Sequence, residues 1–259
     1  MRTGRDNKKK VLGEIAILSD VHSNLEAFTA ALEYIDQLGI KRIYSLGDTV
    51  GYGPNPVECT KLATKHCEVR LMGNHEYALK NPDQLEFNPE ATIATNWTRD
   101  RLEEAGILNT ATELPISLLE SDVLFVHGSV RCAITDYVLS EDYHGYSTFD
   151  SIAQTLENEF VGFRLCFVGH NHLPFLATQE GFLHPHDEIN EFYVADQKLY
   201  VCVGSIGQPR DRDPRASFVV FNGETVKYHR VPYAATVTAK KIRECGLPNK
   251  LADRLLQGK

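Results

Sequence analysis

The chain has 259 residues, of which 42% are hydrophobic and 24% are charged. These proportions exclude a disordered, collagenous or coiled-coil chain, and the length suffices for one large α/β domain or two small ones. The 27 Lys and Arg residues against 35 Asp and Glu residues give a formal net charge of −8, which argues against general coating of nucleic acid because that affinity rests on positive side chains.

The N-terminal residues 1–10 are basic and polar, so we expect a solvated tail. The apolar stretch Val11–Leu18 that follows contains Gly13 and Glu14, which makes it too short and too broken for a signal peptide or a membrane span. The six cysteines form no Cys-x-x-Cys pair, and a chain of this length needs no disulfide framework. We therefore expect reduced thiols in a cytoplasmic protein that has no membrane partner.

The first predicted elements form a strand–helix–strand unit. Ile15–Leu18 is an apolar run rich in β-branched residues, which indicates a buried strand. The Ser-Asn pair at 23–24 can cap a helix in which apolar residues recur at helical spacing until Gly39. Ile40–Leu46 is the next strand, so we expect a parallel pair with a right-handed crossover.

The same alternation of strands and helices continues to residue 168. Helices are predicted over Val57–His66, Pro89–Ala105 and Phe149–Phe160, and strands over Glu68–Met72, Leu114–Leu119, Val123–Val126 and Leu165–Val168.

Beyond residue 168 the predicted elements are mostly strands. They are Phe175–Ala177, Phe192–Ala195, Leu199–Val203, Phe218–Phe221 and Glu224–Tyr228. Asn222-Gly223 predicts a type I′ hairpin between the last two. A weaker helical pattern over Val237–Leu256 is interrupted near Gly246 and Pro248. Because the chain shows no repeat and no linker, we expect a single domain over residues 11–259.

Five polar clusters follow predicted strands directly. They are Asp20-Val21-His22, Gly47-Asp48, Gly73-Asn74-His75, His127-Gly128 and Gly169-His170-Asn171-His172. Ligands of open α/β sheets bind outside the carboxyl ends of the strands, so we expect these clusters to converge on one site. Two carboxylates, an amide and several imidazoles without a thiolate suit Mn, Fe, Co, Ni or Zn. Each cluster alone is also consistent with an ordinary turn or a buried histidine, but their joint occurrence favours a metal centre.

These motifs resemble those of the calcineurin-like metallophosphoesterases, which carry D-x-H, G-D-x-x, G-N-H-[DE], H-G and G-H-x-H. The corresponding stretches here are DVH, GDTVGYG, GNHE, VHG and GHNH. The resemblance implies a four-layer α/β/β/α sandwich, with two mixed sheets flanked by helices, and a centre of two divalent transition-metal ions. By the matching positions, one metal would be held by Asp20, His22, Asp48 and His172, and the other by Asp48, Asn74, His127 and His170, with Asp48 bridging.

The resemblance also implies a hydrolase that cleaves phosphate esters with a metal-bridged hydroxide. Two divalent ions about 3.5–4 Å apart lower the pKa of the water between them and neutralise phosphoryl oxygens. Asp48 is catalytic in this scheme because it bridges the ions. His75 would stay off the metals and act as the general acid or the transition-state donor that faces the leaving oxygen.

The second motif separates two branches of this superfamily. Phosphoprotein phosphatases read G-D-x-V-D-R-G, where the acid orients the catalytic histidine and the arginine holds phosphate. Here Gly51 and Tyr52 take those two positions, which argues against a Ser/Thr protein phosphatase. The stretches GDTVGYGPNP, VHGSVR and GSIGQPRDRDPRASF instead resemble the small bacterial and archaeal phosphodiesterase-like branch, which includes proteins labelled diadenosine tetraphosphatase-related.

We therefore expect a phosphodiesterase whose partner is a small or nucleotide-like phosphoester. A phosphomonoesterase or a protein-phosphatase-like enzyme is the first alternative, and a catalytically silent scaffold that binds a partner protein is the second. The intact set of candidate ligands argues against the scaffold.

Substrate phosphate has two candidate ligands, Arg131 and Arg210. The arginines at 210, 212 and 215 could instead pair with Asp211 and Asp213 in a structural loop. Glu180–Tyr193 is an acidic and aromatic stretch that could form a lid, and its two histidines, His184 and His186, are interpreted as surface residues.

Overall fold

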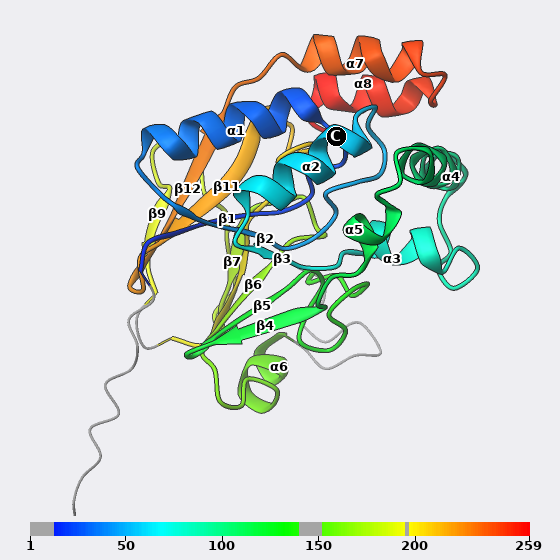
Figure 1. The fold of residues 1–259 in the computed structure, drawn as a ribbon. Helices are drawn as coiled ribbons and strands as arrows, with labels where there is room; N and C mark the ends of the chain where they lie inside the picture. Colours follow the sequence, from blue (N-terminus) through cyan, green and yellow to red (C-terminus); the bar gives the residue numbers. More distant parts are fainter. Residues whose placement is uncertain (1–12, 140–151, 195–196) are drawn as a thin grey trace, which may run out of the picture.

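The computed structural model describes residues 13–139, 152–194 and 197–259, and the predicted tail at residues 1–10 lies outside them. Two six-stranded sheets pack face to face, and helices cover the outer face of each (Figure 1). The protein is therefore an α/β sandwich of four layers, which confirms the expected fold class.

The first sheet has the strand order β3-β2-β1-β11-β12-β9. Its strands are β1 (Ile15–Leu18), β2 (Arg42–Ser45), β3 (Val69–Arg70), β9 (Glu191–Tyr193), β11 (Ala216–Phe221) and β12 (Thr225–Val231). The strands β1, β2 and β3 are parallel, and the other three continue the sheet in antiparallel pairs. The predicted parallel pair at the start of the chain is confirmed.

The second sheet has the strand order β4-β5-β6-β10-β7-β8. Its strands are β4 (Ser117–Glu120), β5 (Val123–Val126), β6 (Leu165–Val168), β7 (Phe175–Ala177), β8 (Phe182–Leu183) and β10 (Leu199–Cys202). The strands β5, β6 and β10 are parallel, and β4, β7 and β8 are antiparallel to their neighbours.

The helices form the outer layers and one end of the molecule. They are α1 (Leu25–Gln37), α2 (Pro56–His66), α3 (Asn74–Lys80), α4 (Pro89–Glu104), α5 (Leu108–Thr112), α6 (Ile152–Asn158), α7 (Ala235–Glu244) and α8 (Asn249–Gln257). Helices α1 and α2 pack on the first sheet, and α6 packs on the second. Helices α3, α4 and α5 gather at one side of the sandwich, and α7 and α8 lie together beyond α1 (Figure 1).

The central strands serve two cores at once. Ile15 and Ile17 of β1 lie in the core between the sheets, together with Phe167 of β6. Ala16 and Leu18 point the other way and pack against α1. Because both faces of these strands are buried, they are apolar at every position rather than at alternate positions. These continuous apolar runs allow the strands to be predicted from the sequence.

Most predicted elements are confirmed to within a few residues, but the turn after β11 is not of the predicted type. A type I′ turn needs positive φ at both central residues, and of this pair only Gly223 has it, at 99°. The side chain of Asn222 instead accepts hydrogen bonds from the backbone nitrogens of Glu224 and Thr225, at 3.0 and 2.8 Å. This side-chain turn closes the same β11–β12 hairpin.

The other differences concern short elements. The helices α3 and α5 and the strand β8 were not predicted. The break near Gly246 is confirmed, because α7 ends at Glu244 and α8 begins at Asn249. Of the helix predicted over 149–160, residues 149–151 lie outside the described residues.

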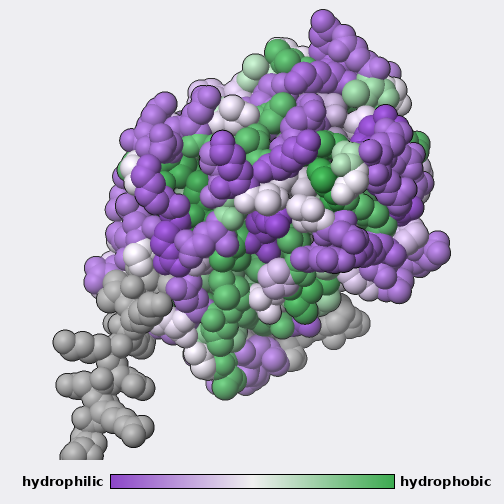
Figure 2. Space-filling view, viewed as in Figure 1, coloured by the Kyte–Doolittle hydropathy of each residue, from purple (hydrophilic) through white to green (hydrophobic). Residues whose placement is uncertain are grey.

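The surface is largely hydrophilic over the helical part of the face in Figure 2, and hydrophobic residues gather in its lower part, near β4. Ile116 and Leu119, beside and within this edge strand, are about half exposed. No helix in the described part of the chain has the length and apolarity that a membrane crossing requires.

Candidate active site

The five polar clusters lie at the carboxyl ends of five strands, taken from both sheets. Asp20 and His22 follow β1, Asp48 follows β2 and Asn74 follows β3 in the first sheet, whereas His127 follows β5 and His170 and His172 follow β6 in the second. All seven side chains are buried, with at most 7% of their surface exposed. The clusters do converge. They lie where the carboxyl ends of strands from both sheets come together, rather than at the edge of a single sheet.

Asp20, His22 and His172 form the first group of potential metal ligands. The Nε2 atoms of the two imidazoles are 3.0 Å apart. The Oδ1 atom of Asp20 lies 3.1 Å from Nε2 of His172 and 3.6 Å from Nε2 of His22. Three donor atoms therefore face one point.

Asp48, His127 and His170 form a second group, which Asn74 joins. Nε2 of His127 lies 3.3 Å from Oδ2 of Asp48 and 3.1 Å from Oδ1 of Asn74. The same Oδ2 atom of Asp48 lies 3.7 Å from Nε2 of His22 in the first group. The Asp48 carboxylate thus stands between the two groups.

The hydrogen bonds at the outer edge of the first group fix the tautomers of its imidazoles. Nδ1 of His22 lies 3.2 Å from the Val50 carbonyl oxygen, and Nδ1 of His172 lies 2.6 Å from that of Gln208. A carbonyl oxygen only accepts, so both Nδ1 atoms carry the hydrogen and both Nε2 atoms present lone pairs. Lone pairs at 3.0 Å, beside the carboxylate of Asp20, repel unless they share a cation, and these N and O donors fit a divalent metal ion.

His170 is oriented in the same way in the second group. Its Nε2 atom lies 3.1 Å from the carbonyl oxygen of Thr135, so this nitrogen donates and Nδ1 is left as the potential ligand. Its backbone nitrogen donates to Oδ2 of Asp20 at 3.0 Å, which ties the two groups together.

The backbone at the site is strained. Asp20, His22, Asp48, His170 and His172 all have φ between 49° and 60°, a left-handed conformation that costs non-glycine residues about 1–3 kcal/mol each. Such strain persists only where the surrounding structure enforces it, and its concentration in the backbone of five of these seven residues marks a functional site.

The charges at the site favour ionised carboxylates and mostly neutral imidazoles. Burial alone would raise the pKa of both Asp20 and Asp48, but the neighbouring histidines hold the pKa of each well below its usual range. Burial lowers the pKa of His170 to about 3 and that of His172 to about 4. Burial opposes protonation of His127 too, but Asp48 raises its pKa to about 9, which shows how strongly this carboxylate attracts a positive charge.

His75 lies beside the two groups at the start of α3, and with His22 and Asp48 it forms a third group of potential metal ligands. Its backbone nitrogen donates to Oδ1 of Asp48 at 2.9 Å, and its ring packs against those of Tyr52 and Phe87, with centroids 4.4 and 4.9 Å away. Burial lowers the pKa of His75 to about 3. The neutral imidazole is therefore the form present at neutral pH.

Gly51 lets the His75 ring lie where it does. A Cβ atom on Gly51 would approach Nδ1 of His75 to 2.3 Å, and the glycine has φ of 91°. Nδ1 of His75 has no hydrogen-bond partner among the described residues. Ring packing rather than a carboxylate holds this imidazole in place.

Glu76 is a structural residue of the site to which the sequence assigned no role. Its carboxylate is 1% exposed and accepts hydrogen bonds from the backbone nitrogens of Thr49, Asp48 and Gly73, at 2.7, 2.8 and 2.9 Å. Burial and the charge of Asp48 raise the pKa of Glu76 to about 7, against these donors, which lower it. The carboxylate joins the loop after β2 to the loop after β3. The only sequence feature that points to this structural role is the position of Glu76 in the motif GNHE, next to the predicted catalytic histidine.

We expect Glu76→Ala to destabilise the protein by about 3–5 kcal/mol, because it leaves several buried N–H groups without an acceptor and opens a cavity. Urea unfolding of the metal-loaded protein measures this. Glu103→Ala, at an exposed position of α4, is the control and should change the unfolding free energy by less than about 0.5 kcal/mol. Equal unfolding free energies of the two variants would show that the hydrogen bonds to Glu76 contribute nothing to stability.

The predicted arginines fall into two classes. Arg131 forms an ion pair with Asp136, at 2.8 Å, and donates to the carbonyl oxygen of Tyr137. Arg210 donates to Oε1 of Gln208, at 2.7 and 3.2 Å, and its backbone nitrogen bonds the carbonyl oxygen of His172 at 3.3 Å. Arg210 therefore adjoins the first group of ligands, whereas Arg131 is engaged by its own loop.

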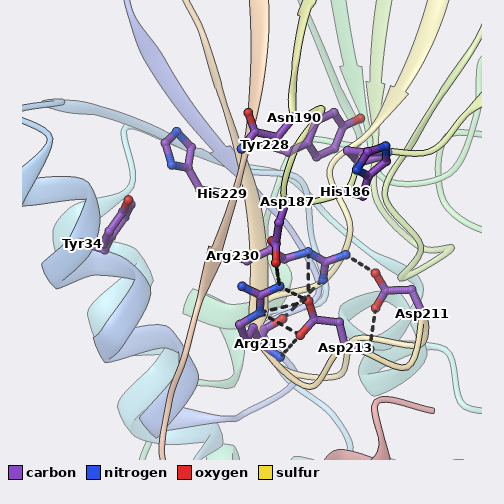
Figure 3. A pocket seen from close by; sticks show the side chains of 11 residues that line it. Tyr34, His186, Asp187, Asn190, Asp211, Asp213, Arg215, Tyr228, His229 and Arg230 are labelled. Atoms are coloured by element: carbon purple, nitrogen blue, oxygen red, sulfur yellow. Dashed lines mark hydrogen bonds and ion pairs between the residues drawn. The ribbon is translucent and has the colours of Figure 1, made fainter.

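Arg215 belongs to a separate ionic network, which lines a cavity of about 450 Å³ (Figure 3). It pairs with Asp213 at 2.6 Å and with Asp187 at 2.9 Å, and Arg230 beside it pairs with Asp211. The structural pairing considered for this loop is thus confirmed for Arg215, but Arg210 does not take part in it.

The segment Glu180–Tyr193, considered as a lid, contacts this network and the first sheet. Its end forms β9, which pairs with β12, and Asp187 bonds Arg215. His184 and His186 are exposed, and they belong to none of the potential metal-ligand groups in the described residues.

Comparisons with known proteins agree with this geometry. A family model described as the calcineurin-like phosphoesterase superfamily domain matches residues 14–225. An uncharacterised protein of Methanocaldococcus jannaschii is 35% identical over 253 residues, which cover 95% of this chain and 98% of that protein.

Two solved structures share the fold over nearly their whole length. A metallophosphoesterase from Sphaerobacter thermophilus is 35% identical, with a TM-score of 0.81, over 95% of this chain and 99% of its own. A hypothetical protein from Pyrococcus horikoshii is 22% identical, with a TM-score of 0.75, over 96% and 99%.

Proposed function

Because the chain belongs to the calcineurin-like phosphoesterase superfamily and is thus a phosphoester hydrolase, we propose that it is a phosphodiesterase with two divalent metal ions, acting on small or nucleotide-like substrates. The observation that carries the proposal is the convergence of two buried groups of donors on either side of Asp48. In each group a carboxylate oxygen and two imidazole nitrogens lie within 4.8 Å of one another.

In this proposal Asp20, His22 and His172 would hold the first metal, Asn74, His127 and His170 would hold the second, and Asp48 would contribute to both. When bound, divalent ions make water a nucleophile at neutral pH and neutralise phosphoryl oxygens. The protein holds the ligands in place through the carbonyl oxygens of Val50, Gln208 and Thr135, since such outer hydrogen bonds fix the tautomer and the ring orientation.

His75 is proposed as the hydrogen-bond donor to the leaving oxygen. Burial favours the neutral form of His75. A neutral imidazole can donate one N–H in a hydrogen bond but has no acidic proton to transfer, which supports a transition-state donor over a general acid. Arg210 is proposed to bind substrate phosphate because it adjoins His172. Arg131 was a second candidate, and its pair with Asp136 makes it the weaker one.

The loop after β2 argues against a Ser/Thr protein phosphatase. Gly51 and Tyr52 stand where phosphoprotein phosphatases have their acid and arginine, so neither the histidine-orienting carboxylate nor that phosphate fork is present at these positions.

The purified protein should contain at least about one transition-metal ion per chain and hydrolyse bis-p-nitrophenyl phosphate when Mn is added. Elemental analysis and a colorimetric assay measure the two quantities, and EDTA should abolish turnover reversibly. A metal-free protein without turnover would favour the scaffold. Faster cleavage of p-nitrophenyl phosphate than of the diester, at equal metal loading, would favour a monoesterase.

A further inference from the structure

We propose that Arg131, the arginine of the VHGSVR stretch, is a positioning residue for the metal centre rather than a ligand of substrate phosphate. It closes the loop 128–138, which follows β5, so that the carbonyl oxygen of Thr135 holds the His170 imidazole in the orientation that binds metal. The inference rests on the proposed function, because it concerns the second group of ligands, and it gives this arginine a role other than the one the sequence suggested.

The loop 128–138 begins and ends beside potential metal ligands. It starts directly after His127, and its last residue, Val138, is bonded to the side chain of Asn171. Nδ2 of Asn171 donates to the Val138 carbonyl oxygen at 2.8 Å, and the Val138 backbone nitrogen donates to Oδ1 of Asn171 at 3.3 Å. Because Asn171 is the residue after His170, the shape of this loop is coupled to the position of both ligands.

Two residues near the end of the loop contact His170 directly. The carbonyl oxygen of Thr135 lies 3.1 Å from Nε2 of His170. The Tyr137 ring stacks on the imidazole, with centroids 3.8 Å apart and an angle of 26° between the planes. The carbonyl oxygen leaves Nδ1 as the ligand atom, and the stacked ring sets the plane in which the lone pair of Nδ1 lies. Contacts of this kind orient a ligand and raise its affinity for metal.

The Arg131 guanidinium holds the two residues that follow Thr135. Its Nε atom donates to Oδ2 of Asp136 at 2.8 Å, and its Nη2 atom donates to the carbonyl oxygen of Tyr137 at 3.2 Å. The side chains of Arg131 and Asp136 are only 18% and 20% exposed, so solvent and salt screen their charges less than those of a surface pair. The rigid fork of arginine makes both bonds at once, which the single ammonium of lysine cannot do.

The same ion pair is tied to the start of the loop. Ser129, which is 1% exposed, donates through Oγ to the Asp136 carboxylate and accepts a hydrogen bond from the backbone nitrogen of Arg131 at 3.0 Å. Gly128 allows the loop to close, because a Cβ atom there would approach the carbonyl oxygen of Cys132 to 2.5 Å. The loop is therefore a closed hydrogen-bonded unit, and Arg131 is the only Lys or Arg in it.

These bonds favour the positioning role over contact with substrate. If Nε and Nη2 of Arg131 bound phosphate, they would have to leave Asp136 and the carbonyl oxygen of Tyr137, which would open the loop and strand a partly buried carboxylate. Positioning of His170 needs no such rearrangement.

The test titrates Mn into the metal-stripped full chain by isothermal titration calorimetry. Arg131→Gln should weaken one of the two Mn sites about 10-fold, the lower end of the effect of disturbing an outer hydrogen-bond partner, and leave the other within about twofold. Asp136→Asn, which is nearly isosteric, should do the same and serves as the test if Arg131→Gln does not fold. The double variant should bind Mn no more weakly than either single variant, because both changes remove one interaction. Arg131→Lys should restore little of the affinity.

Arg164→Gln is the matched control. Arg164 donates through Nε to Oδ2 of Asp122 at 2.9 Å, and the two side chains are 18% and 19% exposed, so this pair has nearly the geometry and burial of the Arg131 pair. Arg164 lies just before β6, whereas His170 lies beyond the opposite end of that strand. The control should lose stability as Arg131→Gln does, but both of its Mn affinities should stay within about twofold of the wild type.

Kinetics on bis-p-nitrophenyl phosphate separate the positioning role from a substrate role. Excess Mn should restore kcat in Arg131→Gln, with KM within about twofold of the wild type. A KM raised about 10-fold at saturating Mn, with both Mn affinities unchanged, would overturn the inference and make Arg131 a phosphate ligand. Equal weakening of Mn binding in Arg131→Gln and Arg164→Gln would also overturn it, because any loss of structure would then have the same effect. A wild-type chain with fewer than two Mn sites would overturn the proposed dinuclear centre itself, and the inference with it.

Discussion

Asp48→Asn is expected to remove most of the bound metal and, with it, the turnover. The Asp48 carboxylate lies between His127 and His22, at 3.3 and 3.7 Å, so one negative charge serves both groups of ligands. Asparagine keeps the size and one oxygen but loses this charge. Altering hydrogen-bonding partners of ligands already weakens metal binding about 10–100-fold, so loss of a bridging ligand should cost at least about 100-fold.

Metal content after dialysis against fixed Mn concentrations measures this effect, alongside circular dichroism to show that the variant folds. Asp36→Asn is the matched control, because that aspartate is 78% exposed and pairs only with Lys41 in the described residues. Asp48→Asn with the metal content of the wild type would remove Asp48 from the ligand set.

His75→Ala is expected to retain metal and lose turnover, the opposite pattern. The contact from position 75 to Asp48 is made by the backbone nitrogen, which alanine keeps. The lost imidazole is the proposed donor to the leaving oxygen, and positioned groups of this kind contribute about 10²–10⁴-fold in rate. We therefore expect kcat on bis-p-nitrophenyl phosphate to fall by that factor at equal metal loading.

His66→Ala, at an exposed position of α2, is the control and should match the wild type. The assignment fails if His75→Ala hydrolyses the diester at the wild-type rate. If the variant loses metal instead, His75 acts as a ligand, which its place in a group with His22 and Asp48 would allow.

Most of the fold was predictable because its determinants are local. β1 and β6 are continuous apolar runs, since both faces of each strand are buried, and each is followed at once by polar residues. A strand that ends in Asp20 or Gly169 is recognisable without any tertiary information.

The residues that the sequence did not reveal act through long-range contacts. The Glu76 carboxylate accepts hydrogen bonds from backbone nitrogens that lie 26–28 positions earlier in the chain, and backbone donors leave no pattern in the sequence. Likewise, the turn at Asn222 depends on a side-chain conformation that Asn-Gly does not determine.

The contact between Gly51 and His75 restricts which amino-acid substitutions this protein can accept during evolution. Any side chain at 51 would overlap Nδ1 of the imidazole and would have to adopt φ near 91°. Aspartate, which phosphoprotein phosphatases carry there, cannot be introduced while the ring keeps its position between Tyr52 and Phe87. A change of branch would need the loop after β2, the ring and its aromatic neighbours to change together. Single substitutions at position 51 should therefore be eliminated by selection, and the two ways of orienting the histidine should remain separate lineages.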